Sequence, residues 1–178
     1  NKVNTILQLR HHEAILALKD KIDSGSKEKV YDIELKYITS RGKWYHTSWK
    51  GDESKSGGIA SNIGIHFFDM LQWIFGPMED FSVYTKTNDT NAGTLIFKKA
   101  KVNWYLSINA NNLPQSAIDK GYSTYRSLSI EGKEIEFSKG FTDLHTASYQ
   151  RIINGEGFGL SDAKNSIEIV SKIRNKEI

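Results

Sequence analysis

Three polar side chains interrupt an apolar segment of the sequence, at Asn62, His66 and Asp69. Asn62 and His66 are four residues apart and Asp69 follows three residues later, so on a helix they would line one side. A histidine can take up or release a proton near neutral pH, whereas an amide can only hydrogen-bond. The spacing therefore predicts a helix whose polar side takes part in acid–base chemistry. The alternative is a structural histidine that is hydrogen-bonded to Asp69.

A second group of candidates lies just before this predicted helix. Cationic and aromatic side chains alternate there, at Arg41, Lys43, Trp44, Tyr45, Trp49, Lys50 and Lys55. Cations bind phosphate or carboxylate oxygens, and aromatic rings stack on a base or cover a sugar. A nucleotide-sugar carries both kinds of group, so we expect it to be bound by Arg41, Tyr45, Trp49, Lys50 and Lys55. The alternative is a solvated loop that its tryptophans anchor to the core.

A third cluster, GFTDLHTASY, places His145 and Tyr149 on one face of a helix that begins near Thr142 or Asp143. Helix capping accounts for Thr142 and Asp143 without any function. His145 joins the candidate substrate-binding residues. A metal site is not expected, because the other histidines lie at no recognised ligand spacing from His66.

Hydrophobic periodicity predicts the elements that must position these residues. Apolar residues at helical spacing indicate one helix between Ile6 and Ile22 and another from about Ile59 to Phe75, which Gly76-Pro77 would end. Two further helices close the chain, one from about Asp143 to Ile153 and one opened by Ser161, with Ile167, Val170 and Ile173 on one side. The segment between Arg41 and Gly58 has no period and is expected to be a long loop.

Alternating residues predict a set of short strands between these helices. The expected strands cover residues 30–39, 81–86, 94–98, 102–110, 124–131 and 134–138, with turns at Asn91-Ala92-Gly93 and Gly132. Strands in a run with helices at both ends predict an α+β domain over residues 1–178, with an open, mostly antiparallel sheet and helices packed on one face. The other face would expose Trp104 or Tyr105 in a broad apolar surface, so we expect a homo-oligomer, dimer or tetramer, paired through the sheet.

Composition excludes several classes of protein. The 178 residues carry a formal net charge of +3 from 24 basic and 21 acidic side chains, which gives no reason to expect a nucleic-acid partner. The chain has no cysteine, which suits a reducing compartment, and no apolar run long enough to cross a bilayer. We therefore expect a cytoplasmic protein without a membrane partner.

Several stretches resemble a known enzyme family. Lys55, Gly57-Gly58, Asn62, Gly64, His66 and Asp69 are similar to the signature of the carboxy-terminal domain of the glucose-fructose oxidoreductase and inositol dehydrogenase family. The longer stretches YITSRGKWYHTSWKGDESKSGG, SNIGIHFFDMLQWIFG and EFSKGFTDLHTASY look like its UDP-N-acetylglucosaminuronate 3-dehydrogenases, which act in lipopolysaccharide sugar biosynthesis.

The resemblance implies an NAD-dependent enzyme that oxidises the 3-hydroxyl of a UDP-N-acetyl-hexosaminuronate. His66 would be or assist the base, Asn62 would take the place of the wider family's aspartate and orient the sugar, and Asp69 would orient His66. An amino-terminal Rossmann domain, which binds most of the NAD and carries the family's active-site lysine, would precede Asn1. The isolated chain would then be inactive. The alternative is a non-catalytic nucleotide-sugar-binding or oligomerisation module.

Overall fold

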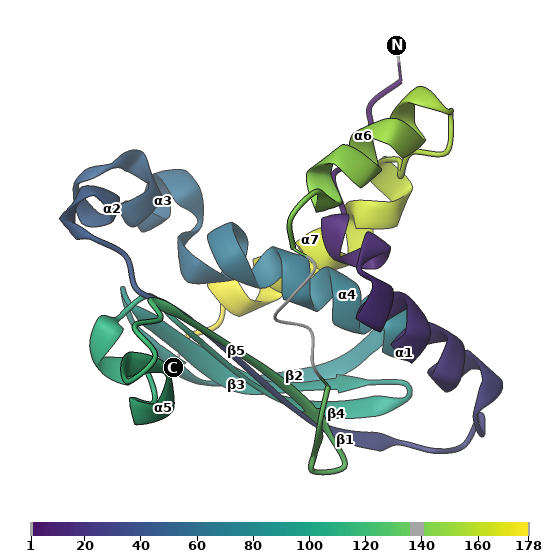
Figure 1. The fold of residues 1–178 in the computed structure, drawn as a ribbon, viewed down its shortest axis with the longest axis horizontal. Coiled ribbons are helices and arrows are strands. Elements are labelled where there is room, and N and C mark those ends of the chain that lie inside the picture. The colour runs from purple at the N-terminus through teal and green to yellow at the C-terminus, as the bar shows by residue number, and fades with distance from the viewer. Residues whose placement is uncertain (1, 136–140, 178) are drawn as a thin grey trace.

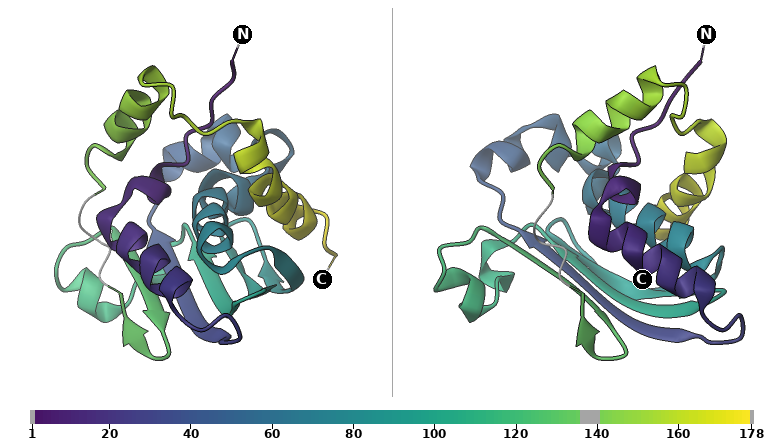
Figure 2. Two further views of the ribbon diagram at one scale, coloured as in Figure 1. Left: turned by 90° about the vertical axis from the view of Figure 1, so that its right-hand side faces the viewer. Right: turned by 45° about the vertical axis from the view of Figure 1, so that its right-hand side comes forward.

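One open sheet forms the base of the fold, and helices lie on one of its two faces (Figures 1 and 2). The computed structural model describes residues 2–135 and 141–177. The sheet has six strands in the spatial order β2-β3-β4-β1-β5-β6. Their bounds are β1 Tyr31–Thr39, β2 Met78–Lys86, β3 Thr90–Phe97, β4 Ala100–Ser107, β5 Thr124–Ile130 and β6 Lys133–Glu134.

The pairing of the strands confirms an α+β domain with a mostly antiparallel sheet. Strands β1 and β4 run parallel in the centre, and the other neighbouring pairs are antiparallel. The central pair is parallel because the chain leaves β1, forms a helix and then returns through the β2-β3-β4 meander. The strand expected at residues 134–138 lies mostly outside the described residues.

Three long helices cover one face of the sheet, namely α1 (Glu13–Ser24), α4 (Ile65–Phe75) and α7 (Leu160–Arg174). Helix α6 (Leu144–Ile153) lies farther from the sheet, beside the amino-terminal segment (Figure 1). The short helices α2 (Lys43–Thr47) and α3 (Glu53–Ser56) lie between β1 and α4, in a segment that projects from the rest of the fold (Figure 1). This segment is called the α2–α3 excursion below. The remaining short helix is α5 (Gln115–Ile118), between β4 and β5.

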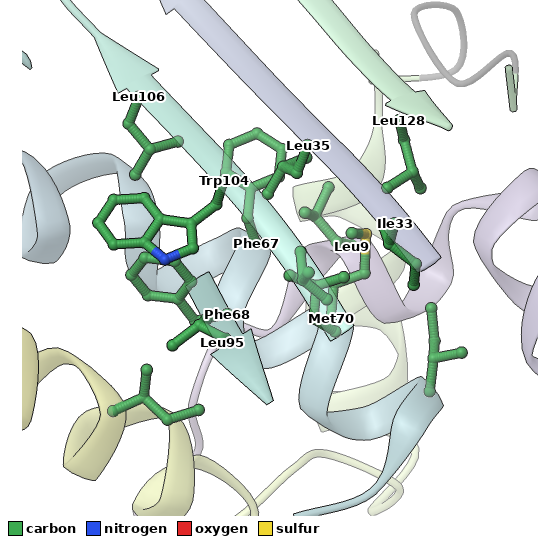
Figure 3. Close-up of a cluster of buried hydrophobic side chains, with 14 of the residues drawn as sticks. Leu9, Ile33, Leu35, Phe67, Phe68, Met70, Leu95, Trp104, Leu106 and Leu128 are labelled. Carbon is green, nitrogen blue, oxygen red and sulfur yellow. The ribbon is translucent and has the colours of Figure 1, made fainter. Parts of the chain in front are cut away.

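The apolar side of α4 packs on the central strands (Figure 3). The rings of Phe68 and Trp104 meet edge to face, with centroids 5.4 Å apart and an interplanar angle of 78°. Complete burial of an aromatic side chain of this size contributes about 1.5–3 kcal/mol. The side chains predicted to form the apolar side of this helix are all buried: Phe67, Phe68, Leu71, Ile74 and Phe75. The core therefore fixes which side of α4 faces away from the sheet.

The opposite face of the sheet is polar. No helix among the described residues covers it (Figure 2). Glu34 and Lys36 are exposed there, and Asn103 donates a hydrogen bond to Glu34 across the strands at 2.7 Å. Trp104 points into the core, so Tyr105 is the aromatic residue of this pair on the uncovered face. The expectation of a broad apolar surface on this face was wrong.

The predicted first helix is interrupted. Residues Gln8–His11 form a 3-10 turn, and α1 begins only after His12, whose Nδ1 accepts a hydrogen bond from the backbone of Ala14. An N-cap side chain of this kind satisfies an orphan N–H group and starts a new helix. The apolar residues at helical spacing did not reveal this break.

Three other expectations need correction. The segment predicted as a loop at residues 41–58 contains α2, α3 and a 3-10 turn at Trp49–Gly51. The predicted turn at Asn91-Ala92-Gly93 lies inside β3. Its glycine serves the sheet instead of a turn: a Cβ at Gly93 would lie 2.0 Å from the carbonyl oxygen of Ser82, so only glycine lets β2 approach this closely. In α7, Ile167 is exposed while Val170 and Ile173 are buried.

Candidate functional site

The helix that carries Asn62 and His66 begins with a π turn. Residues Ala60–Gly64 form this turn and continue directly into α4. Gly57 and Gly58, just before it, have φ angles of +78° and +70°, a left-handed conformation that residues with a Cβ rarely adopt. The glycine pair is therefore required where the helix begins, and π turns occur frequently at functional sites.

Asn62 holds the α2–α3 excursion against this helix. Its amide nitrogen donates to the Tyr45 hydroxyl and to the Lys50 carbonyl oxygen, both at 3.3 Å. Both amide protons are therefore used within the protein, and only the amide oxygen remains to accept a hydrogen bond from a ligand. The predicted orienting role of Asn62 is limited to that oxygen.

His66 is half-buried near the start of α4. Burial lowers the pKa of His66 below its ordinary value, the negative charge of Asp69 partly opposes this shift, and the charge of His145 adds to it. An imidazole with a lowered pKa is neutral at neutral pH and can accept a proton. His66 therefore has the protonation state that a general base needs.

His145 lies in the first turn of α6 and is exposed. The charge of His145 contributes to the lowered pKa of His66, so the two histidines interact electrostatically. Asp143 is the N-cap residue of α6 by position, but it has φ +68° and its side chain makes no capping hydrogen bond. The fold thus brings together two histidines that the sequence analysis had assigned to separate clusters.

Asp69 forms a buried ion pair with Arg10. Nε of Arg10 donates to Oδ2 of Asp69 at 2.9 Å, and Nη2 donates to Oδ1 at 2.7 Å. Only 7% of Arg10 and 3% of Asp69 is exposed. The predicted hydrogen bond between His66 and Asp69 is not formed in the described residues, where the carboxylate instead accepts both of its hydrogen bonds from Arg10. Asp69 acts on His66 through its charge alone.

The candidate residues of the excursion differ in their availability to a ligand. Tyr45 is only 4% exposed, so its ring cannot stack on a base, whereas Trp49 is 58% exposed. The ammonium group of Lys50 lies 5.9 Å from the Trp49 ring centroid, in a cation–π contact, and Lys50 is exposed. Trp49 and Lys50 together therefore present an exposed ring and a cation.

Arg41 and Lys55 also differ in their availability to a ligand, because only one of them already has an anionic partner. The guanidinium of Arg41 lies 5.9 Å from the Tyr45 ring, and its buried Nε has no hydrogen-bond partner. Lys55, by contrast, forms an exposed ion pair with Asp52 at 3.0 Å. Hydrogen bonds from Ser54 and Lys55 lower the pKa of Asp52 to about 2. Of these two cations, Arg41 is the one left without an anionic partner in the described structure.

The described ranges 2–135 and 141–177 lack two other features, a metal site and a membrane-spanning helix. They contain no group of three or more His, Cys, Asp or Glu side chains arranged to hold a metal ion. No helix in these ranges combines the length and the apolar character needed to cross a membrane.

Comparison with known proteins agrees with this architecture. Residues 19–115, which run from α1 to α5, match the model of the oxidoreductase family's C-terminal alpha/beta domain (GFO/IDH/MocA). The chain belongs to this family. The resemblance to the glucose-fructose oxidoreductase and inositol dehydrogenase family is thus confirmed.

Members of the GFO/IDH/MocA family with solved structures include close relatives. The chain is 46% identical to the WlbA (WbpB) dehydrogenase from Thermus thermophilus in a complex with NAD and alpha-ketoglutarate, with a TM-score of 0.94, covering 99% of this chain and 57% of that chain. A complex of the Thermus enzyme with NAD and UDP-GlcNAcA matches at 45% identity and a TM-score of 0.93, covering 100% of this chain and 57% of that chain. The WlbA dehydrogenase from Bordetella pertussis shares the fold at 18% identity and a TM-score of 0.71, over 97% of this chain and 59% of that chain.

The chain thus spans less than two thirds of the length of these GFO/IDH/MocA relatives.

Two arginines of the chain, Arg10 and Arg126, were not among the residues predicted from the sequence. Arg10 lies 59 positions before its partner Asp69, and no local pattern connects them. Arg126 lies on β5 beside the Tyr37 ring, and only the strand pairing reveals that contact.

Proposed function

We propose that this chain is the substrate-binding part of an NAD-dependent oxidoreductase that oxidises the 3-hydroxyl of a UDP-N-acetyl-hexosaminuronate. The similarity to the Thermus enzyme carries the proposal, since it extends over 99–100% of the chain and that enzyme forms complexes with NAD and UDP-GlcNAcA. A role in lipopolysaccharide sugar biosynthesis is part of the same proposal. So is a cytoplasmic location, which suits a chain without cysteine.

His66 is the acid–base residue in this proposal. Its neutral imidazole would take the proton of the sugar hydroxyl, and the lowered pKa that burial gives His66 keeps the imidazole unprotonated. NAD, when bound, accepts the hydride that leaves the same carbon. His145, which is exposed and interacts electrostatically with His66, would contact the sugar from the side of α6.

The α2–α3 excursion would bind the nucleotide end of the substrate. Trp49 offers an exposed ring for the uracil base, and Lys50 and Arg41 offer cations for the diphosphate. Asn62 fixes this excursion to the helix that carries His66 through Tyr45 and Lys50. A single helix would thus connect the nucleotide-binding segment to the reacting carbon.

The described residues do not fit the phosphates of a dinucleotide. Such a site needs a glycine-rich turn between a strand and a helix. The glycines of Gly155-Glu-Gly-Phe-Gly159 lie between helices α6 and α7 instead. We therefore assign the binding of NAD mainly to the part of the full-length protein outside this chain.

We also propose that the uncovered face of the sheet pairs with a second copy. That face presents Glu34, Lys36 and Tyr105 without a covering helix among the described residues. A polar interface of this kind would pair charges of opposite sign across the two copies. Light scattering of the full-length protein at tens of micromolar should give a dimer or tetramer, and a monomer would contradict this part of the proposal.

The test of the proposed activity is NAD reduction, followed by the absorbance of the reduced nicotinamide with UDP-GlcNAcA as substrate. The full-length protein should reduce NAD, and the isolated chain should not. NAD reduction by the isolated chain would contradict the assignment of NAD binding mainly to the part of the full-length protein outside this chain. Binding of the sugar nucleotide by the full-length protein without reduction would favour a non-catalytic binding module.

A further inference from the structure

Arg41 and Arg126 stand apart from the other arginines of the described structure. In each, Nε is buried and has no hydrogen-bond partner. Neither guanidinium forms an ion pair with a carboxylate of the described residues, whereas Arg10 and Arg151 do. Leaving a buried donor unpaired is unfavourable, so a cation kept in this state is a candidate for binding an anion from outside the chain.

Arg126 faces the side of the sheet that the helices cover. It is paired with Tyr37 across the antiparallel β1–β5 ladder, and Leu128, two residues further on, is completely buried on the same face. Its guanidinium carbon lies 5.3 Å from the Tyr37 ring centroid and 4.3 Å from the Phe141 ring centroid. Two aromatic rings therefore hold the guanidinium in place without neutralising its charge.

These rings connect Arg126 to the candidate acid–base residue. The Tyr37 ring packs on the Phe67 ring with centroids 4.9 Å apart, and Phe67 follows His66 on α4. Phe141 precedes α6, whose first turn carries His145, and His145 is close enough to act on His66. Arg126 also lines an open hollow beside α5, so solvent reaches this part of the sheet. Arg126 therefore contacts the aromatic layer that packs against α4, the helix that carries His66.

The geometry points to Arg126 as the residue that recognises the carboxylate of a uronate sugar. This inference rests on the proposed function. A guanidinium matches a carboxylate through two parallel hydrogen bonds, which a neutral hydroxymethyl group cannot accept in the same way. Arg41, four residues beyond Tyr37 and hence roughly 13 Å further along the chain, is left for the diphosphate. Arg126 thus determines specificity, distinguishing a uronate from the corresponding neutral sugar.

The test compares two ligands that differ only at this group, UDP-GlcNAcA and UDP-GlcNAc. Their dissociation constants are measured by calorimetry with the full-length protein and with its Arg126→Gln variant. Arg126→Gln should weaken binding of UDP-GlcNAcA by about 10- to 100-fold, the range for losing a charged hydrogen bond. It should leave binding of UDP-GlcNAc within about threefold of the unmodified protein.

The ratio of the two constants is the decisive quantity, because a partly unfolded variant lowers the apparent affinity for both ligands equally. Arg126→Lys, which keeps the charge but loses the planar fork, provides a second variant and should retain part of the preference for the uronate. Arg151→Gln removes an exposed arginine on α6 and should leave the ratio unchanged.

Equal weakening for both ligands in Arg126→Gln would overturn the inference and assign Arg126 to the diphosphate or to packing. An unmodified protein that binds UDP-GlcNAc as tightly as UDP-GlcNAcA would also overturn it, while the proposed binding of a nucleotide-sugar would stand. If the unmodified protein bound neither ligand, the proposed function would fail together with the inference.

Discussion

Both carboxylate oxygens of Asp69 accept hydrogen bonds from the buried guanidinium of Arg10, at 2.9 and 2.7 Å. Arg10 precedes α1, and Asp69 lies one turn after His66 on α4. Arg10 also donates to the backbone oxygen of Asp162 in α7 at 3.1 Å. One side chain therefore joins three segments of the fold around the helix that carries His66.

Breaking this ion pair should destabilise the protein strongly. Asp69→Asn removes the carboxylate that is hydrogen-bonded to the buried guanidinium of Arg10 and leaves only the carboxylate of Asp162, whose Oδ1 lies 4.0 Å from Nη1. Breaking a buried ion pair in this way costs about 3–5 kcal/mol of unfolding free energy. Urea denaturation measures this difference. Lys164→Ala, which removes an exposed ion pair with Glu168 on α7, is the control and should cost less than about 1 kcal/mol. An equally small loss in Asp69→Asn would contradict the role given to the buried pair.

Asn62→Asp should loosen the α2–α3 excursion. A carboxylate cannot donate to the Lys50 carbonyl oxygen as the amide does, so that link is lost. Amide hydrogen exchange should accelerate in residues 43–56 and remain unchanged in the β3–β4 hairpin. The added negative charge should also raise the pKa of His66, which NMR titration measures. Unchanged exchange in the excursion would show that Asn62 does not hold it.

The lowered pKa of His66 predicts a dependence of stability on pH. The unfolded state has the ordinary histidine pKa of about 6.5, so between the two pKa values the unfolded chain binds more protons than the folded one. The free energy of unfolding should therefore rise with pH in that window. The contribution of His66 is complete above about pH 6.5 and is lost as the pH falls through the folded-state value.

His66→Asn should flatten this part of the stability profile, measured by urea denaturation between about pH 5 and pH 7.5. His11 contributes a second slope of the same sign, because burial, followed by the charges of Arg151 and Arg10, lowers its pKa as well. A His11→Gln variant separates the two slopes. If His66→Asn left the profile unchanged in the His11→Gln background, the environment assigned to His66 would be incorrect.

Trp49 and Trp44 form a matched pair for testing the nucleotide site, since they are 58% and 55% exposed. Neither substitution by alanine should change stability by more than about 0.5 kcal/mol. Trp49→Ala should weaken binding of a UDP-sugar by about 1–3 kcal/mol if its ring stacks on the base, and Trp44→Ala should not. If the two variants bound the UDP-sugar with equal affinity, the proposed stacking of the Trp49 ring on the base would be contradicted.

Much of the fold could be predicted from the sequence because its strands and long helices have strong periodicity. The alternation of Ile33 and Leu35 with Glu34 and Lys36 fixes the two faces of β1, and the apolar spacing of Phe67, Phe68 and Leu71 fixes the buried side of α4. The residues that break a period were misjudged. Gly93 looked like a turn, but it is a position of close approach between two strands.

The candidate site was less predictable, because its contacts connect distant parts of the chain. His66 and Asn62 could be assigned to one side of a helix from their spacing. The ion pair of Asp69 with Arg10 and the aromatic layer around Arg126 depend on how α4, β5 and the amino-terminal segment pack together. Burial could not be inferred for Tyr45, whose neighbours Trp44 and His46 are exposed on the same short helix.

The most direct test of the central claim is the turnover of His66→Asn in the full-length protein, measured with NAD and UDP-GlcNAcA. Asparagine keeps a polar side chain but cannot accept the hydroxyl proton. Turnover should fall by roughly 10²- to 10⁴-fold, the usual contribution of a positioned acid or base, while the dissociation constant for UDP-GlcNAcA stays nearly unchanged. Preserved turnover in a folded variant of lower stability would contradict the account and make His66 a structural histidine.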